Sequence, residues 1–243
     1  MFKIFNVIYN NKIDSDFGIY AIKRPNIPCP EKEKEDVPIK GADETLTRYK
    51  NEGFKNITIS VEYNFKDTEY FNFKCRKIKN WFLGTITDRK LRFSDDDDVF
   101  YIVKNVKLED IERQWKVLGK FTVEFECSPY AWLNNGLRKV NIPKNNGRFY
   151  NSFLRCKPEW HFKGNGTVDL NVNGKLVVIK VGEYVIINTE LQKCYKDNKV
   201  VSLSIESGSY NDLWLREGEN DINWSVKSGD IKSVTIIPHY KTL

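Results

Sequence analysis

The sequence lacks a long apolar segment. No run of about 18 uncharged apolar residues occurs in its 243 residues, so it encodes no typical membrane-spanning helix. The mean hydropathy of -0.54 also argues against a membrane protein, whereas 40% hydrophobic and 14% aromatic residues exclude a disordered chain. The N-terminal segment MFKIFNVIYNNKID is too polar for the core of a signal peptide. We therefore expect no membrane association, and a product that stays in the compartment where it is made.

Residues that hold metals or cofactors are scarce. The sequence has two histidines, His161 and His239, and an odd number of cysteines with no Cys-x-x-Cys pair. Zinc sites need several such ligands at short spacing, and a disulfide framework needs paired cysteines. We predict no metal site, no cofactor and five reduced cysteines: Cys29, Cys75, Cys127, Cys156 and Cys194.

Motifs of well-known enzymes are also absent. The sequence contains no Gly-x-Ser-x-Gly, no His-Glu-x-x-His, no Gly-x-x-x-x-Gly-Lys-[Ser/Thr] and no Gly-x-Gly-x-x-Gly. Neither histidine lies in a motif that would make it part of a catalytic triad. The 33 acidic residues leave paired carboxylates open, because a sequence does not show their separation. We predict no catalytic residue, with a glycan-degrading enzyme as an open alternative.

Charge of one sign is not concentrated in one region. The formal net charge is +6 and the pI is near 8.9, but the lysines are dispersed among acidic residues. This distribution is typical of a solvated surface rather than of a nucleic-acid groove, so we expect no nucleic-acid partner. The acidic run Asp95–Asp98 lacks the spaced pattern of a calcium loop and favours a turn kept open by like-charge repulsion.

Alternation of apolar and polar residues is the strongest pattern in the chain. It extends over residues 121–127 and predicts a strand with one buried face, which Pro129 ends. Residues 57–63 show the same period. Asn10-Asn11 tolerates left-handed backbone angles and favours a hairpin near the N-terminus.

One segment has helical periodicity. The apolar residues of 67–83 recur at helical spacing, Asp67 is an acceptable N-cap and Gly84 is placed to end the helix. Residues 41–55 are polar and rich in turn formers, so we expect most of them to be loop. Residues 24–38 contain four prolines and a mixed-charge patch, which excludes a helix or a central strand and leaves an exposed loop or an extended arm.

The C-terminal part of the chain reads as strand after strand. Clusters of turn formers mark a connection near residues 145–152, so we place the domain boundary between residues 148 and 149. Beyond it, seven apolar runs are separated by glycines, with Asn173-Gly174 as the clearest hairpin turn. Even spacing without helical periodicity predicts a β-sandwich or jelly roll.

Three tryptophans of this second domain are candidates for sugar stacking. Trp224 alternates with Ile222 and Val226, which places all three on one face and favours a core position. Trp160 is also more easily explained as structural, whereas Trp214 lies in a loop-like segment, where it either pins the loop or stands exposed. Trp214 is therefore the one candidate contact for a sugar or a partner.

The order and spacing of several short segments resemble those of a known family. The segments are Arg-Pro-x-Ile-Pro, a helix with Trp81 near its end, Leu-x-Phe-Ser-Asp-Asp with a following tyrosine, and Gly-Lys-Phe-Thr-Val-Glu-Phe-Glu-Cys-Ser-Pro-Tyr. The matching residues are Arg24, Pro25, Ile27, Pro28, Trp81, Leu91, Phe93, Ser94, Asp95, Asp96, Tyr101, 119–125, Cys127, Pro129 and Tyr130. Together they resemble the distal tail proteins of long-tailed bacteriophages (siphophages).

The resemblance implies a structural protein at the tip of a phage tail. It implies a mainly β fold, with an N-terminal, β-sandwich-like, ring-forming domain that carries one α-helix (1–148) and a C-terminal galectin-like or jelly-roll β-sandwich (149–243). In that family a homo-hexameric ring joins the tail tube protein to the tail-associated lysin or tip protein and to receptor-binding proteins, and a host glycan is a further possible partner. The implied location is the virion, after synthesis in the host cytoplasm.

The resemblance also gives the proline-rich segment a role. It implies an arm that lies on a neighbouring subunit, with these residues as candidate contacts: Arg24, Pro25, Ile27, Pro28 and Pro30. The EKEKED patch departs from the family pattern within this arm. The main alternative to a tail protein is a carbohydrate-binding module without a tail role.

Overall fold

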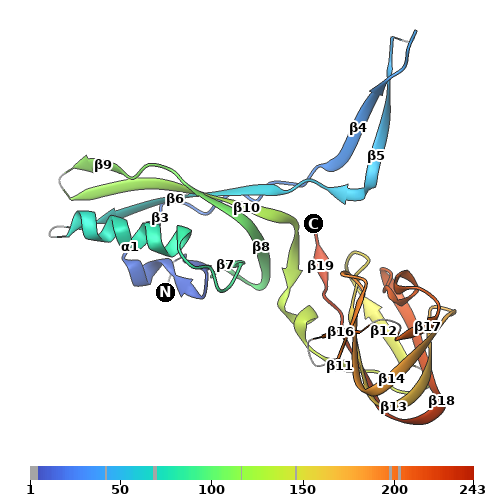
Figure 1. Cartoon of the computed structure of the whole chain (residues 1–243). Helices are drawn as coiled ribbons and strands as arrows, with labels where there is room; N and C mark the ends of the chain where they lie inside the picture. The colour runs from blue at the N-terminus through green and yellow to red at the C-terminus, as the bar shows by residue number, and fades with distance from the viewer. Residues whose placement is uncertain are drawn as a thin grey trace. The chain divides into compact units, whose positions relative to one another are not determined.

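The structure, a computed structural model, describes residues 5–41, 43–67, 70–115, 117–145, 147–196, 199–201 and 204–243. Within these ranges the chain is mainly β with one α-helix, which confirms the predicted fold class (Figure 1). The chain divides into two compact units, Met1–Ala131 with Leu243, and Trp132–Thr242. The helix is too short and too polar to cross a membrane, and the described residues form no other α-helix.

The N-terminal sheet has nine strands among the described residues. Its main path runs β2-β1-β7-β8-β10-β6-β3, and β9 and β19 pair with β10. The strands are β1 (Val7–Tyr9), β2 (Lys12–Ile13), β3 (Tyr20–Ala21), β6 (Ile57–Lys66), β7 (Lys90–Phe93), β8 (Asp96–Leu108), β9 (Glu112–Trp115), β10 (Leu118–Leu133) and β19 (Lys241–Thr242). Asn10 and Asn11, with φ of 51° and 56°, connect β1 to β2, which confirms the predicted hairpin.

The core of the first unit lies between this sheet and the helix α1 (Phe71–Leu83). Strands β6 and β10 pair antiparallel along their length, and their alternate residues are buried, as the sequence pattern predicts. Trp81 and Phe82 of α1 are buried, and the Phe82 ring lies 5.9 Å from that of Phe125. The short 3-10 helix η1 (Asp14–Phe17) adds Phe17, which stacks on Trp81 at 4.4 Å.

Two predicted element ends are wrong. Strand β10 continues through the buried Pro129 to Leu133, although its pairing with β6 does end at Cys127. A proline fits there because no β6 carbonyl needs its missing N–H. The helix begins at Phe71, not at residue 67, and the Asp67 carboxylate accepts the Tyr70 N–H at 2.8 Å just before it.

The end of the helix is confirmed. Gly84 follows its last residue and donates its N–H to the Asn80 carbonyl at 3.1 Å. The turn predicted for the acidic run Asp95–Asp98 contains only Asp95, because the hairpin from β7 to β8 turns between Phe93 and Asp96. Asp96, Asp97 and Asp98 then begin β8 as exposed residues.

The polar region of the chain between β3 and β6 forms a separate two-stranded sheet. It pairs β4 (Lys32–Pro38) with β5 (Thr45–Phe54) and shares no strand with the nine-stranded sheet (Figure 1). The expectation that most of residues 41–55 are loop is therefore wrong. Both faces of this hairpin are largely exposed, so it has no apolar alternation by which a strand is usually recognised. We call β4, β5 and the turn between them, residues 32–54, the hairpin arm.

The C-terminal sheet has eight strands among the described residues. Its main path runs β11-β18-β13-β14-β15-β16, with β12 paired to β18 and β17 to β14. The strands are β11 (Val140–Asn141), β12 (Gly147–Asn151), β13 (Glu159–Val172), β14 (Lys175–Asn188), β15 (Lys193–Lys196), β16 (Lys199–Val201), β17 (Ile205–Ser207) and β18 (Gly218–Ile237). The remaining elements are the 3-10 helices η2 (Asn134–Leu137) and η3 (Tyr210–Leu213). Asn173 and Gly174 turn β13 into β14, as predicted, with φ of 53° and 84°.

Three long strands of this sheet bend at one level. Gly166 of β13 pairs with Gly229 of β18, and the neighbouring Asn165 pairs with Gly182 of β14. Gly166 and Gly229 have positive φ, and the β13–β18 register shifts on both sides of the level. Such bulges and glycines curl a sheet, so that residues before and after the bend share one core. Val226 lies close to the bend and is 36% exposed, so its predicted core position is wrong, whereas Ile222 and Trp224 are buried.

The boundary between the two units lies earlier than the sequence suggested. The contacts divide the chain after Ala131, whereas the turn-rich composition placed the boundary after residue 148. Residues 132–148 belong to the second unit because β11 and β12 both pair with β18. Ile142 is buried in its core, and its carbonyl accepts the Trp224 Nε1–H at 2.9 Å.

Candidate assembly surfaces

The extended segment before the hairpin arm is fixed to the rest of the chain at Arg24. The Arg24 guanidinium pairs with the Asp95 carboxylate and lies over the Phe5 ring, 5.5 Å from its centroid. Asp95 belongs to the turn between β7 and β8. Arg24, which the resemblance implies as an arm contact, thus holds the start of the extended segment that leads to the hairpin arm.

The other predicted arm residues form an extended segment without a strand. Ile27 and Pro28 are exposed, whereas Pro25 and Pro30 are half-buried. The segment leads into β4, and its end is tied to the end of β5. There the Lys55 N–H donates to the Glu31 carbonyl at 2.8 Å and the two side chains form an ion pair at 3.0 Å.

The hairpin arm exposes apolar side chains on a two-stranded ribbon. Leu46 and Val37 lie directly opposite each other, so they share one face, and Leu46 is 46% exposed. Ile39, just beyond β4, and Tyr49 are 49% and 67% exposed. An isolated two-stranded hairpin is only marginally stable in water. This ribbon therefore offers both backbone and apolar groups to a partner.

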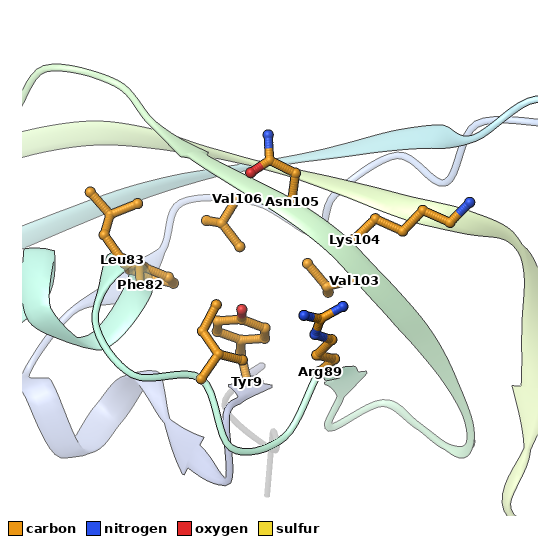
Figure 2. A pocket seen from close by; sticks show the side chains of 9 residues that line it. Tyr9, Phe82, Leu83, Arg89, Val103, Lys104, Asn105 and Val106 are labelled. Carbon is orange, nitrogen blue, oxygen red and sulfur yellow. The ribbon is translucent and has the colours of Figure 1, made fainter.

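A hollow of about 170 Å³ lies between β1, the end of α1 and β8 (Figure 2). Its lining combines apolar side chains with the polar groups of Arg89, Lys104 and Asn105. The lining residues are Tyr9, Phe82, Leu83, Ile86, Arg89, Val103, Lys104, Asn105 and Val106. The Tyr9 hydroxyl is buried and has no hydrogen-bond partner among the described residues. Burial raises the pKa of Tyr9, while the nearby Arg89 lowers it, so the hydroxyl keeps its proton at neutral pH.

The C-terminal unit holds a polar cluster around His161. The His161 Nε2 lies 2.8 Å from a Glu159 carboxylate oxygen, and its Nδ1 contacts the Tyr184 hydroxyl and, at 3.3 Å, the Lys139 amine. The hydrogen bond from His161 holds the pKa of Glu159 below its usual range. His239 lies nearby in the charge network, and its burial lowers the pKa of the imidazole. The cluster joins β13 and β14 to Lys139, which directly precedes β11.

Trp214 is half-buried and covered by cations. The Arg155 guanidinium and the Lys157 amine lie 4.9 and 5.0 Å from the centre of its ring. The other two candidates for sugar stacking, Trp160 and Trp224, are buried, and the Trp160 Nε1–H donates to the Leu213 carbonyl at 3.1 Å. A sugar that stacked on Trp214 would compete with these two cations, and its role as a sugar or partner contact stays a prediction.

Sequence reasoning missed the hairpin arm and the hollow. The arm has one usable signal, because Thr45, Thr47 and Tyr49 place β-favouring residues at every second position after the turn formers near Gly41. The hollow has no signal of its own, since Tyr9 and Arg89 are 80 positions apart and meet only through the pairing of β1 with β7.

The fold of the chain matches that of a phage protein. The match is the Dit protein of phage SPP1, described as a paradigm of the hub adsorption apparatus in phages that infect Gram-positive bacteria. The TM-score is 0.66 at 14% identity, and the match covers 99% of this chain and 100% of the phage protein. The chain has the Dit fold. At this identity the match concerns the fold alone.

A family model and two further solved structures also match this chain. Residues 34–129 match the family described as phage tail protein N-terminal domain, and this range includes α1, most of the hairpin arm and most of β10. Two chains of the phage P2 baseplate, in its activated conformation with Ca or Sr, give TM-scores of 0.49 and 0.45 at 10% and 11% identity. They cover 100% and 96% of this chain, and 99% and 96% of their own length, but the scores are too low to add to the argument. No curated protein sequence matches the chain.

Proposed function

We propose that the chain is a structural virion protein of a long-tailed phage or prophage and forms a hexameric ring at the tip of the tail. The ring joins the tail tube protein to the baseplate or tail-associated lysin and to receptor-binding proteins. The Dit fold over nearly the full length of both chains carries this proposal, and the match of residues 34–129 to phage tail proteins supports it. The N-terminal unit forms the ring in this proposal, and the C-terminal unit, which we take to be galectin-like, meets a protein or a host glycan.

The hairpin arm supplies the contact between neighbours. In a closed ring each subunit uses one surface to hold the next subunit and a different surface to be held. The arm provides the first surface, because its exposed ribbon gains stability when apolar side chains and edge backbone groups are covered. Arg24 and the prolines that follow fix its direction at the base.

The test is the oligomeric state of the purified chain. Light scattering with size-exclusion chromatography measures the mass, and negative-stain imaging shows the symmetry. In one variant a short Gly-Ser linker replaces residues 32–54, and since Glu31 and Lys55 are already hydrogen-bonded, the linker closes without strain. We expect six-fold rings from the full chain and folded monomers from the variant. Intact rings from the variant contradict the role of the arm.

A point variant separates the contact from the loss of a whole segment. Leu46→Asp places a charge on the exposed apolar face of the arm and should weaken ring formation. Leu176→Asp is the matched control, because Leu176 is 53% exposed in a hairpin of the C-terminal unit. A full chain that stays monomeric both alone and with the tail tube protein contradicts the ring itself.

A further inference from the structure

The hollow beside α1 has the size of a side-chain anchor site. Its volume of about 170 Å³ is below the roughly 300–1,000 Å³ typical of small-molecule pockets. Leu83 and Ile86 line it and are 55% and 41% exposed, which is unusual for large apolar residues so close to a core. A protein segment that inserted one or two apolar side chains would cover them, as anchor residues do at protein interfaces.

The polar groups of the hollow restrict the chemistry of an occupant. Figure 2 shows the Tyr9 hydroxyl directed into the hollow, where it is a buried donor with no acceptor among the described residues. The Arg89 side chain is exposed and forms no ion pair within the described part of the chain. Lys104 is engaged, because its amine donates to the Asn56 side chain at 2.6 Å. The matching occupant therefore combines an apolar side chain with a negative charge.

The end of the hairpin arm has this combination. Leu46 and Val37 lie on one face, and Ile39 is exposed beside them. Asp43 and Glu44 are adjacent, exposed, and in no ion pair within the described residues. Strand β5 has 10 residues, which span about 30 Å at the usual rise per residue, so the arm reaches across to an adjacent small domain.

We propose that the hollow of one subunit receives the end of the hairpin arm of a second copy of this chain. Leu46 packs against Leu83 and Ile86, and the carboxylates of Asp43 and Glu44 face Arg89. The arm does not fill the hollow of its own subunit, since Leu46 remains 46% exposed there. This inference rests on the proposed ring and names the surface that the arm grips.

Intermolecular cross-linking tests the contact directly. In a Cys29→Ser background, which removes the exposed native thiol, Leu46→Cys and Ile86→Cys are combined and the assembled protein is oxidised with diamide. Because every copy both inserts an arm and receives one, we expect a ladder of covalent oligomers up to the hexamer on a non-reducing gel. The control combines Leu46→Cys with Leu176→Cys and should give no such ladder. Rings that yield no ladder overturn the docking and leave the ring standing.

Charge reversal provides a second, independent measurement. Arg89→Glu should raise the dissociation constant of the ring by about tenfold or more, as expected when like charges face each other. Adding Asp43→Lys and Glu44→Lys to that variant should restore assembly. Lys227→Glu in the C-terminal unit is the control with the same change in net charge, and thermal melting verifies that each variant is folded. Assembly that is insensitive to Arg89→Glu overturns the docking, whereas a wild-type chain that forms no ring overturns the docking and the proposed function together.

Discussion

Asp14 shows how burial of one carboxylate makes stability depend on pH. It is fully buried at the start of η1 and accepts the N–H groups of Val7 at 3.0 Å and Ser15 at 2.8 Å. Desolvation outweighs these two hydrogen bonds and raises the pKa of Asp14 to about 6. The folded chain therefore holds a proton at a pH at which the unfolded chain has released it.

The sign of the effect follows from that difference in bound protons. Between the unfolded pKa of 3.8 and the folded pKa of about 6, the folded state binds more protons, so the free energy of unfolding decreases as the pH rises. The loss is roughly 2–3 kcal/mol by about pH 7, at 1.36 kcal/mol for each unit of pKa shift. Asp14→Asn should abolish this part of the pH dependence.

Urea unfolding at a series of pH values between about 4 and 7 measures the Asp14 contribution as the difference between wild type and Asp14→Asn. The exposed Asp110, which is not among the groups that shift the pKa of Asp14, provides the control variant, Asp110→Asn, which should follow the wild-type profile. Parallel profiles for wild type and Asp14→Asn would show that folding does not change the pKa of Asp14.

At the scale of single elements, the bend of the C-terminal sheet depends on individual glycines. Gly166 has φ of 147°, and a Cβ there would overlap the Ser228 carbonyl oxygen across the sheet. Gly182 lies at the same level of β14 but has open space around its missing Cβ and no positive φ. We expect Gly166→Ala to lower the free energy of unfolding by about 3 kcal/mol or more, and Gly182→Ala to change it by less than about 0.5 kcal/mol.

Thermal or urea unfolding of the two glycine variants, followed by near-UV circular dichroism, distinguishes backbone strain from a general intolerance of side chains at the bend. Equal losses for Gly166→Ala and Gly182→Ala would contradict the assignment of the bend to Gly166 and its partner Gly229.

The elements predicted well from sequence are those with one buried face and one solvent-exposed face. Strands β6 and β10 bury alternate residues, and α1 buries one stripe, so the hydrophobic period reports their structure directly. The hairpin arm has no buried face, which leaves only weak β-propensity as a signal. Pro129 misled because a proline ends pairing on one edge of a strand without ending the strand itself.

At the scale of the whole molecule, the position of the unit boundary has a direct test. A fragment of residues 132–243 contains all of β11 and β12, whereas one of residues 149–243 lacks β11, Ile142 and the first residues of β12. Without Ile142 the buried indole Nε1–H of Trp224 loses its acceptor, and Val140 no longer pairs with Ile236 on β18. We expect the longer fragment to unfold cooperatively and the shorter one to be largely unfolded or aggregated.

Circular dichroism and the dispersion of amide resonances report folding of the two fragments. A shorter fragment as stable as the longer one would restore the boundary suggested by the turn-rich composition. The boundary was misplaced because the turn formers between β11 and β12 connect two strands of the second unit and mark no linker.

The candidate surfaces were only partly visible in the sequence. The prolines excluded a central strand, and the resemblance to distal tail proteins implied an arm with Arg24 among its contacts. The gripping part of the proposed contact lies further along, in residues 32–54, and the receiving hollow is assembled from β1, α1 and β8. Such a site arises from tertiary packing, which no local pattern encodes.

The shared bend in the C-terminal sheet has a mechanical consequence. Strands β13, β14 and β18 run through both halves of the curled sheet, so a force that peels one of them must break hydrogen bonds on both sides of the bend. In a sandwich whose two sheets are joined only by loops, the sheets can separate without breaking a strand. Here the strands themselves continue from one half of the sheet into the other. Under load, this unit should resist until it yields in a single step, a property that suits the tail-tip role we propose.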